Sequence, residues 1–238
     1  METVLVVGAT GNIGVSAVKA ALNTGRNVIA VVRNQASTSK LIRHVGTSKG
    51  ITIAEADVTS PDGVQSVVQR VREGQLPSFQ HVYSSVGAFD LTPRITDIST
   101  EAFRKIMNIN LEANFFAYRA TIPYLLEQKY EKSTWTLMTG AAGDSGWAGV
   151  TAISQGALFS LANVACRELA ESSIRFNEVW LAFRVEHDEM AAKNGSVGSS
   201  AFAPHYERIL SRPEISASRV RLAKPADISD FTWSKKLV

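Results

Sequence analysis

The sequence predicts an α/β protein built on a doubly wound parallel β-sheet with helices on both faces. Short apolar runs rich in β-branched residues, such as residues 4–7, alternate with longer segments of helical periodicity. The first of these runs leads directly into a glycine-rich turn and an amphipathic segment. That order is typical of a β-α-β unit that binds a ligand at its first turn.

Length and composition set limits on the class of protein. The 238 residues are enough for one sizeable core, and we expect a single domain over residues 1–238. The one cysteine, Cys166, excludes an intramolecular disulfide framework, and a net charge of +3 is too small to indicate nucleic-acid binding. No apolar run approaches the ~18 residues that span a bilayer, and the chain opens on a strand. We therefore expect a cytoplasmic protein that binds no membrane.

The turn after the first strand has the sequence Gly-Ala-Thr-Gly-Asn-Ile-Gly. Gly8 permits a tight turn, Gly11 lets a pyrophosphate approach backbone N–H groups at the start of the helix predicted over 12–23, and Gly14 lets that helix pack on the sheet. A dinucleotide is therefore expected here. The predicted phosphate cradle comprises Gly8, Thr10, Gly11, Asn12, Ile13 and Gly14.

The second predicted strand, residues 27–32, ends at Arg33. A site that prefers NAD(H) usually places an Asp or Glu here, bonded to the ribose 2′-hydroxyl. Residues 3–54 contain no acidic residue, and the guanidinium fork of Arg33 suits a 2′-phosphate. The sequence thus predicts NADP(H) as the cofactor; a solvated arginine at a strand end is the alternative interpretation.

The alternation continues along the chain and predicts a Rossmann-type sheet, which binds its ligands at the carboxyl ends of the strands. Pro123 is a candidate kink in the long helical region. Residues 185–222 contain the least patterned stretch, which we interpret as a variable substrate or lid segment, with a disordered loop as the alternative. The further predicted elements are helices at 37–45, 61–72, 99–129, 151–171 and 225–235 and strands at 51–54, 81–84, 134–139 and 174–183.

Several motifs then match one known family. They are Asp57-Val58, Ser84-Ser85-Val86-Gly87, Asn110-Leu111, Thr139–Gly143, and Glu168-Leu169-Ala170 with Ile174-Arg175-Phe176-Asn177. Over nearly its whole length the chain resembles the short-chain dehydrogenases/reductases. Its glycine turn resembles the atypical branch, which includes fungal NmrA-like proteins. The resemblance implies that Asp57 and Val58 contact adenine, that the cofactor lies along Ser85, Val86 and Gly87, and that Asn110 belongs to the active site.

The same resemblance implies a Ser, Tyr and Lys proton relay, which this chain lacks. Gly140 stands at the Ser position, Thr151 at the Tyr position and Gln155 at the Lys position. A threonine hydroxyl without an adjacent cation does not reach the acidity that proton transfer near neutral pH requires. Thr139 and Asp144 are further acid candidates, although Asp144 is equally explained as a turn former. The candidate catalytic residues are Asn110, Thr139, Asp144 and Thr151; no metal ligands are predicted.

Three functions remain open at this point. The first is an oxidoreductase that transfers a hydride to an activated small molecule such as an iminium ion, without the proton relay. The second is a non-redox cyclase or isomerase, similar to fungal biosynthetic members of the family, with apolar walls from Phe89, Trp147 and Phe183. The third is an NADP(H)-sensing regulatory protein without catalysis.

The resemblance also bears on assembly and on the sheet edge. Members of the family usually pair two helices across a twofold axis, and the regions 110–128 and 152–170 carry more apolar residues than one face needs. A homodimer is therefore expected. The family's usual last strand and its Asp-Gly-Gly motif are not recognisable here, so we expect the final strand to be missing and that edge to be shortened or rebuilt.

Overall fold

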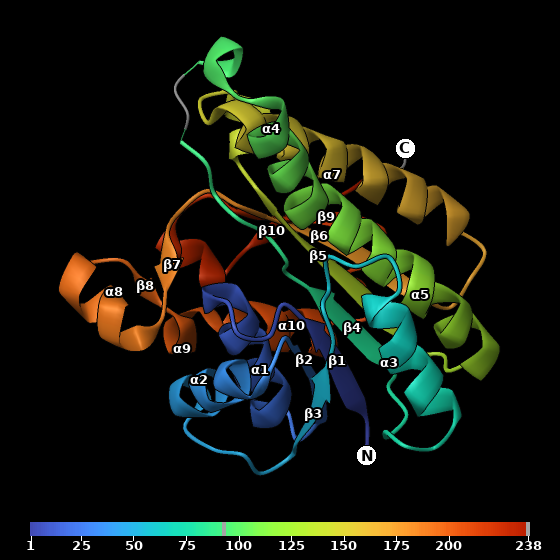
Figure 1. Cartoon of the computed structure of the whole chain (residues 1–238). Helices are drawn as coiled ribbons and strands as arrows, with labels where there is room; N and C mark the ends of the chain where they lie inside the picture. Colours follow the sequence, from blue (N-terminus) through green and yellow to red (C-terminus); the bar gives the residue numbers. More distant parts are fainter. Residues whose placement is uncertain (92–93, 237–238) are drawn as a thin grey trace.

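The computed structural model describes residues 1–91 and 94–236, and an eight-stranded sheet forms its centre (Figure 1). The strand order is β10-β9-β6-β5-β4-β1-β2-β3, and among the described residues only β10 runs antiparallel to its neighbour. The strands are β1 (Thr3–Val7), β2 (Asn27–Val32), β3 (Ile51–Glu55), β4 (His81–Ser84), β5 (Thr134–Gly140), β6 (Arg175–Leu181), β9 (Ser218–Leu222) and β10 (Thr232–Lys235).

Helices cover both faces of this sheet (Figure 1). Alternate side chains of a strand point to opposite faces, so Leu5 and Val7 join one apolar core and Val4 and Val6 the other. The first core is covered by α3 (Gly63–Arg72), α5 (Ala113–Gln128) and α7 (Gly149–Glu168), and the second by α1 (Asn12–Asn23), α2 (Gln35–Val45) and α10 (Pro204–Ser211). The predicted doubly wound α/β fold is confirmed.

The expected loss of the final strand is wrong. β9 pairs in parallel with β6, and β10 extends the sheet where a last helix at 225–235 was expected. Only Pro225–Ile228 forms a helical turn, η3. The signal lay in the alternation within β9, where Ser218, Val220 and Leu222 are buried and the two intervening arginines are not. Such period-2 patterning is typical of a strand.

The long helical region breaks at a different place from the one predicted. α4 (Thr100–Met107) is joined to α5 by a π-helical turn, η2 (Asn108–Glu112), and Pro123 lies inside the continuous α5. Along this region Ile106, Ile122 and Leu125 are buried, whereas Phe103, Phe115 and Leu126 are exposed. The wider π turn shifts the angular position of every later side chain, which a regular 3.6-residue period does not anticipate.

One helix among the described residues, α7, is long and apolar enough to cross a membrane by length and composition alone, with a mean hydropathy of 1.3. Its residues do not form one unbroken apolar run in the sequence. In the fold, α7 packs on the sheet through Leu158, Ala162 and Ala165, which are fully buried. A core helix meets the same length and composition criteria, so this finding is weak support for a membrane span.

The segment 185–222 is ordered into short elements beside α1 and α2 (Figure 1). It contains β7 (Val185–Glu186), α8 (Asp188–Asn194), β8 (Val197–Gly198), α9 (Ser199–Phe202), α10 and β9, and β7 pairs with β8. The backbone N–H of His187 donates to Asn12 Oδ1 (3.2 Å), and Ser199 Oγ donates to the Asn12 carbonyl (2.7 Å). The segment is therefore fastened to the first residue of α1.

Candidate active site and cofactor cradle

The glycine turn is shaped by close backbone approach. A Cβ on Gly14 would lie 2.0 Å from the carbonyl oxygen of Gly8, and one on Gly8, whose φ is +85°, would lie 3.1 Å from the amide nitrogen of Val86. Neither position tolerates a side chain. The turn therefore lies directly against the end of β4, the neighbour of β1 in the sheet.

This turn presents free backbone donors at the start of α1. The helix has no side-chain cap at Gly11, and the amides of Asn12 and Ile13 have no hydrogen-bond partner among the described residues. Unpaired N–H groups and the positive end of the helix dipole together favour a bound anion. The predicted phosphate cradle thus has the geometry that a pyrophosphate requires.

The end of β4 adds an unsatisfied polar atom to the same place. Asn114 of α5 holds this segment: its Oδ1 accepts from Ser84 Oγ (2.6 Å), and its Nδ2 donates to the Val86 carbonyl (2.8 Å). Ser85 lies between Ser84 and Val86, and its Oγ is buried and has no hydrogen-bond partner among the described residues. A buried hydroxyl without a partner is costly, so a polar group of a ligand lying along Ser85 and Gly87 would stabilise it.

Arg33 and Asp57 meet at the ends of β2 and β3. Arg33 is exposed and forms no hydrogen bond or ion pair with the described residues. Asp57 Oδ1 accepts from both the hydroxyl (2.7 Å) and the amide (3.0 Å) of Thr59. These bonds, aided by the positive field of Arg33, hold the pKa of Asp57 below its usual value. An ionised Asp57 and a free guanidinium therefore lie near one another, with Val58 adjacent in the chain.

Asn110 lies on the π turn and is fully buried. Its Oδ1 accepts from the Ala88 amide (2.7 Å), and its Nδ2 donates to the Ala88 carbonyl (3.0 Å) and to Ser154 Oγ on α7 (2.9 Å). The side chain thus joins the loop after β4 to α7. Gly87 stands beside it, since a Cβ there would lie 3.6 Å from Asn110 Oδ1.

Thr151 and Gln155 also bind backbone groups. Thr151 Oγ1 accepts from the Asp90 amide (2.8 Å) and donates to the Asp90 carbonyl (3.1 Å). Gln155 Oε1, one turn further along α7, accepts from the Gly140 amide (2.7 Å). The structure therefore brings Gly140, Thr151, Gln155 and Asn110 into one region at the carboxyl ends of β4 and β5.

Thr139 and Asp144 are directed elsewhere. Thr139 Oγ1 donates to Glu178 Oε1 on β6 (2.8 Å), beneath the helices of the first face. Asp144, on α6 (Ala142–Ser145), accepts from Trp180 Nε1 (2.7 Å) and lies 3.7 Å from Arg219. Both side chains belong to a polar cluster under the β6–β9 edge, away from Thr151 and Gln155.

Two polar residues that hold the site together, Asn114 and Ser154, were not predicted from the sequence. A signal existed for Asn114: it lies four residues after Asn110, so both amides share one helix face. Ser154 precedes Gln155 and had no such signal. Glu186 of β7 accepts hydrogen bonds from Arg184, Asn194 and Ser196.

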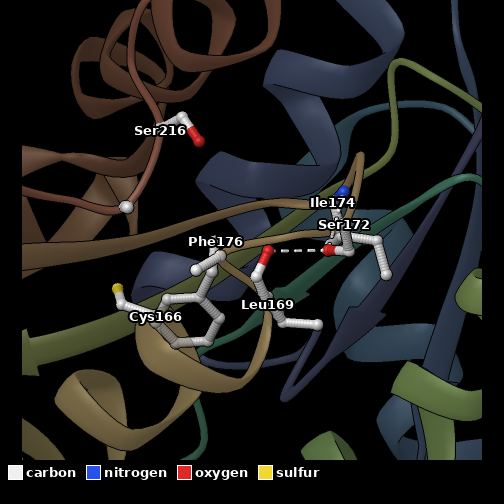
Figure 2. Close-up of a pocket in the computed structure, with 8 residues that line it drawn as sticks. Cys166, Leu169, Ser172, Ile174, Phe176 and Ser216 are labelled. Carbon is white, nitrogen blue, oxygen red and sulfur yellow. Dashed lines mark hydrogen bonds between the residues drawn. The ribbon is translucent and has the colours of Figure 1, made fainter.

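Two cavities lie outside this region. Figure 2 shows one of about 60 Å³ at the amino end of β6, where Cys166, Leu169, Phe176 and Ser216 line it. Cys166 is 1% exposed, and burial raises the pKa of its thiol to about 11. A second cavity of about 250 Å³ lies between α1 and the end of α2.

Comparisons with known proteins agree with this architecture. A family model described as short chain dehydrogenase matches residues 2–191. The short-chain dehydrogenase/reductase iacG of Pestalotiopsis fici is 54% identical over 241 residues, covering 99% of this chain and 96% of that protein. A solved short chain dehydrogenase from Pseudomonas syringae has a TM-score of 0.79 at 20% identity, covering 94% of each chain.

A second solved structure, a short chain dehydrogenase from Shigella flexneri 2a complexed with NADP, has a TM-score of 0.76 at 20% identity. The structural alignment covers 90% of this chain and 92% of the Shigella chain. At these identities the solved structures support the fold. The family model and the fungal relative go further and confirm the resemblance found in the sequence: this chain belongs to the short-chain dehydrogenase/reductase family.

Proposed function

We propose that this protein is an NADP(H)-dependent oxidoreductase that transfers a hydride to a small molecule already activated for attack, without a Ser-Tyr-Lys proton relay. One observation carries the proposal. A complete cofactor cradle adjoins a region in which Thr151 and Gln155 both bind backbone groups and neither is placed as a proton donor. These contacts support an enzyme that binds the cofactor but does not use Thr151 and Gln155 to transfer a proton.

The cradle fits NADP(H) group by group. The free amides of Asn12 and Ile13 would hold the pyrophosphate, and the guanidinium of Arg33 would pair with the 2′-phosphate. Asp57 with Val58 would bind adenine, and the orphaned hydroxyl of Ser85 would gain a partner. NADP in the Shigella flexneri structure supports this choice. Bound here, NADPH supplies a hydride from its nicotinamide ring.

The proton balance selects the kind of substrate. A ketone that accepts a hydride becomes an alkoxide and needs an acid, whereas an iminium ion becomes a neutral amine and needs none. The hydroxyl of Thr151 already donates to the Asp90 carbonyl, and that of Thr139 to Glu178. Asn110 holds the loop and α7 in place. A positively charged or otherwise activated electrophile therefore suits this site.

The test measures cofactor binding and turnover separately. Titration with NADP⁺ should give saturable binding, and iminium compounds should cause a substrate-dependent loss of NADPH absorbance. Conversion of a substrate without that loss would replace the proposal by a non-redox cyclase or isomerase. Cofactor binding with no conversion of any iminium probe would instead favour a regulatory protein.

We further propose a homodimer that uses the outer surfaces of α5 and α7. Phe115 and Leu126 on α5 and Ile153 and Val164 on α7 are large, apolar and exposed, and exposed apolar surface of this kind is typical of an interface. Sedimentation should give a dimer that Val164→Asp weakens. A monomer at all concentrations would exclude this interface.

A further inference from the structure

Two large aromatic side chains are exposed next to the candidate active site. Phe89, on the loop after β4, is 57% exposed, and Trp147, between α6 and α7, is 61% exposed. Their ring centroids are 5.5 Å apart and their planes are tilted by 55°. The rings therefore touch each other while most of their surface stays open, although neither belongs to an apolar core.

The backbone around Phe89 is unusually well held for an exposed loop. Asn110 forms hydrogen bonds with both the amide and the carbonyl of Ala88, the residue before it. Thr151 does the same with Asp90, the residue after it. Four hydrogen bonds thus fix the peptide units on either side of one exposed aromatic ring, and the ring is presented in a defined position.

Trp147 is also fixed by its neighbours. It lies between Gly146, whose φ of +70° ends α6, and Ala148, which is fully buried. Gly149 follows with a φ of +50°. Two left-handed glycines allow the chain to turn sharply on both sides of the tryptophan, and the buried alanine anchors the turn to the protein.

We propose that Phe89 and Trp147 form an aromatic clamp that selects substrates with a planar aromatic or conjugated ring, and that Thr151 is a positioning residue of this clamp. This inference rests on the proposed function, because it takes the substrate to be an activated electrophile such as an iminium ion. Preorganised aromatic faces bind planar rings well, and cationic rings best, because the electron-rich faces attract positive charge. The same hydrogen bonds join the clamp to Asn110 and α7, which favours a ring of the bound substrate as occupant over a second copy of the chain.

Two probes of equal charge separate this recognition from simple electrostatics. N-methylquinolinium is a planar aromatic iminium ion, and 1,2-dimethyl-1-pyrrolinium is an aliphatic one. Their dissociation constants are measured by fluorescence titration of the NADP⁺ complex, which needs no turnover. Phe89→Ala and Trp147→Ala should each raise the dissociation constant of N-methylquinolinium about fivefold to tenfold. The dissociation constant of 1,2-dimethyl-1-pyrrolinium should change less than twofold. Phe103→Ala, which removes an exposed phenylalanine on α4, is the matched control and should change neither constant.

The role of Thr151 is tested through hydroxyl chemistry. Thr151→Val keeps the shape of the side chain but loses both hydrogen bonds to Asp90. It should therefore weaken the binding of N-methylquinolinium as much as Phe89→Ala and Trp147→Ala do. Thr151→Ser keeps the hydroxyl and should restore the affinity. A purely structural role would predict equal losses for both probes, and that result would overturn the positioning role.

Other outcomes also decide the proposal. Equal effects of Phe89→Ala on both probes, or no effect on either, would exclude the clamp. So would a change of oligomeric state in Phe89→Ala or Trp147→Ala, since the pair would then be a contact between copies. Selective loss of N-methylquinolinium supports the clamp even if no probe is reduced, so failure of the proposed redox function is distinguishable.

Discussion

At the scale of single residues, Gly140, Thr151 and Gln155 are the three positions that the sequence resemblance aligns with a Ser-Tyr-Lys relay. Thr151 holds Asp90 by two hydrogen bonds, and Gln155 holds the amide of Gly140. A Cβ on Gly140 would lie 3.7 Å from Gln155, an ordinary contact. The hydroxyl of Thr151 and the side-chain oxygen of Gln155 are thus both engaged by backbone groups.

Restoring the relay should not restore ketone reduction. We expect the protein and its variant Gly140→Ser/Thr151→Tyr/Gln155→Lys to leave simple ketones unreduced, because the variant loses the Asp90 and Gly140 contacts along with the old residues. NADPH oxidation with aldehydes and ketones measures this. Gly140→Ser alone, which the available space accommodates, is the control and should keep cofactor binding. Ketone turnover near the ~10 s⁻¹ typical of enzymes would contradict the prediction.

Arg33 should determine cofactor choice. Arg33→Ala should weaken NADP⁺ binding about tenfold to a hundredfold, the range for loss of a charged hydrogen bond, and leave NAD⁺ binding nearly unchanged. Binding titrations with both nucleotides check this. Arg43→Ala, a basic residue of α2 in the same acid-free region, controls for a general loss of positive charge. If Arg33→Ala kept the same ratio of NADP⁺ to NAD⁺ affinity, Arg33 would not be the residue that binds the 2′-phosphate.

At the scale of elements, one buried acid ties the C-terminal edge to the rest of the sheet. Glu178 on β6 is fully buried and pairs with Arg219 of β9 (3.1 Å) and with Lys236, just after β10. It also accepts from Thr139 on β5. The two C-terminal strands, absent from the sequence expectation, are thus joined to the strand that precedes the Gly140 loop.

Removing this acid should destabilise the fold. Glu178→Ala removes the acidic partner of Lys236 and one of the two acids beside Arg219, which keeps Asp144 at 3.7 Å. Breaking a buried ion pair in this way costs about 3–5 kcal/mol. Urea denaturation gives the free energy of unfolding. Glu171→Ala, an exposed acid just after α7, changes the net charge equally and should cost less than about 0.5 kcal/mol. Similar costs for the two variants would show that the cluster contributes little.

At the scale of the whole molecule, buried histidines set the response to acid. Burial lowers the pKa of His81, His187 and His205 to about 4, from 6.5. Below pH 6.5 the unfolded chain takes up protons at these positions while the folded protein does not. Stability should therefore fall as the pH drops from about 6.5 to about 4, by up to about 1.4 kcal/mol per pH unit for each histidine.

A single variant tests this linkage. His187 stacks on His44 with ring centroids 3.7 Å apart, and His187→Phe keeps an aromatic ring there but removes the proton site. Between pH 4 and 6.5, the slope of the unfolding free energy against pH should fall by up to about 1.4 kcal/mol per pH unit, which corresponds to one proton. An unchanged slope would mean that His187 titrates alike in both states. Glu2, whose pKa is lowered to about 2 in the folded protein, adds to the slope from about pH 5 downward in both proteins, so it cancels from the difference between them.

The sequence by itself determined the parallel strands from β1 to β6, the glycine turn and the family, but not the edge formed by β9 and β10. These features rest on short-range patterns: apolar runs of one strand length, a helical period, and glycines whose spacing is fixed by the backbone of a single turn. Arg33 was predicted at the end of the second strand from the same kind of pattern, whereas Asp57 entered only through the family resemblance. Their part in binding NADP(H) stays a prediction.

Only the tertiary structure decided what the polar side chains of the site contact. Thr139 was a candidate acid, yet its partner Glu178 lies 39 residues away. Thr151 stands at the Tyr position, but its contact with Asp90 spans 61 residues. Hydrogen-bond partners at such separations depend on how strands and helices pack, and on irregularities such as the π turn at Asn110. Local sequence patterns carry no information on either, because the partner of a polar group is set by the fold that brings the two together.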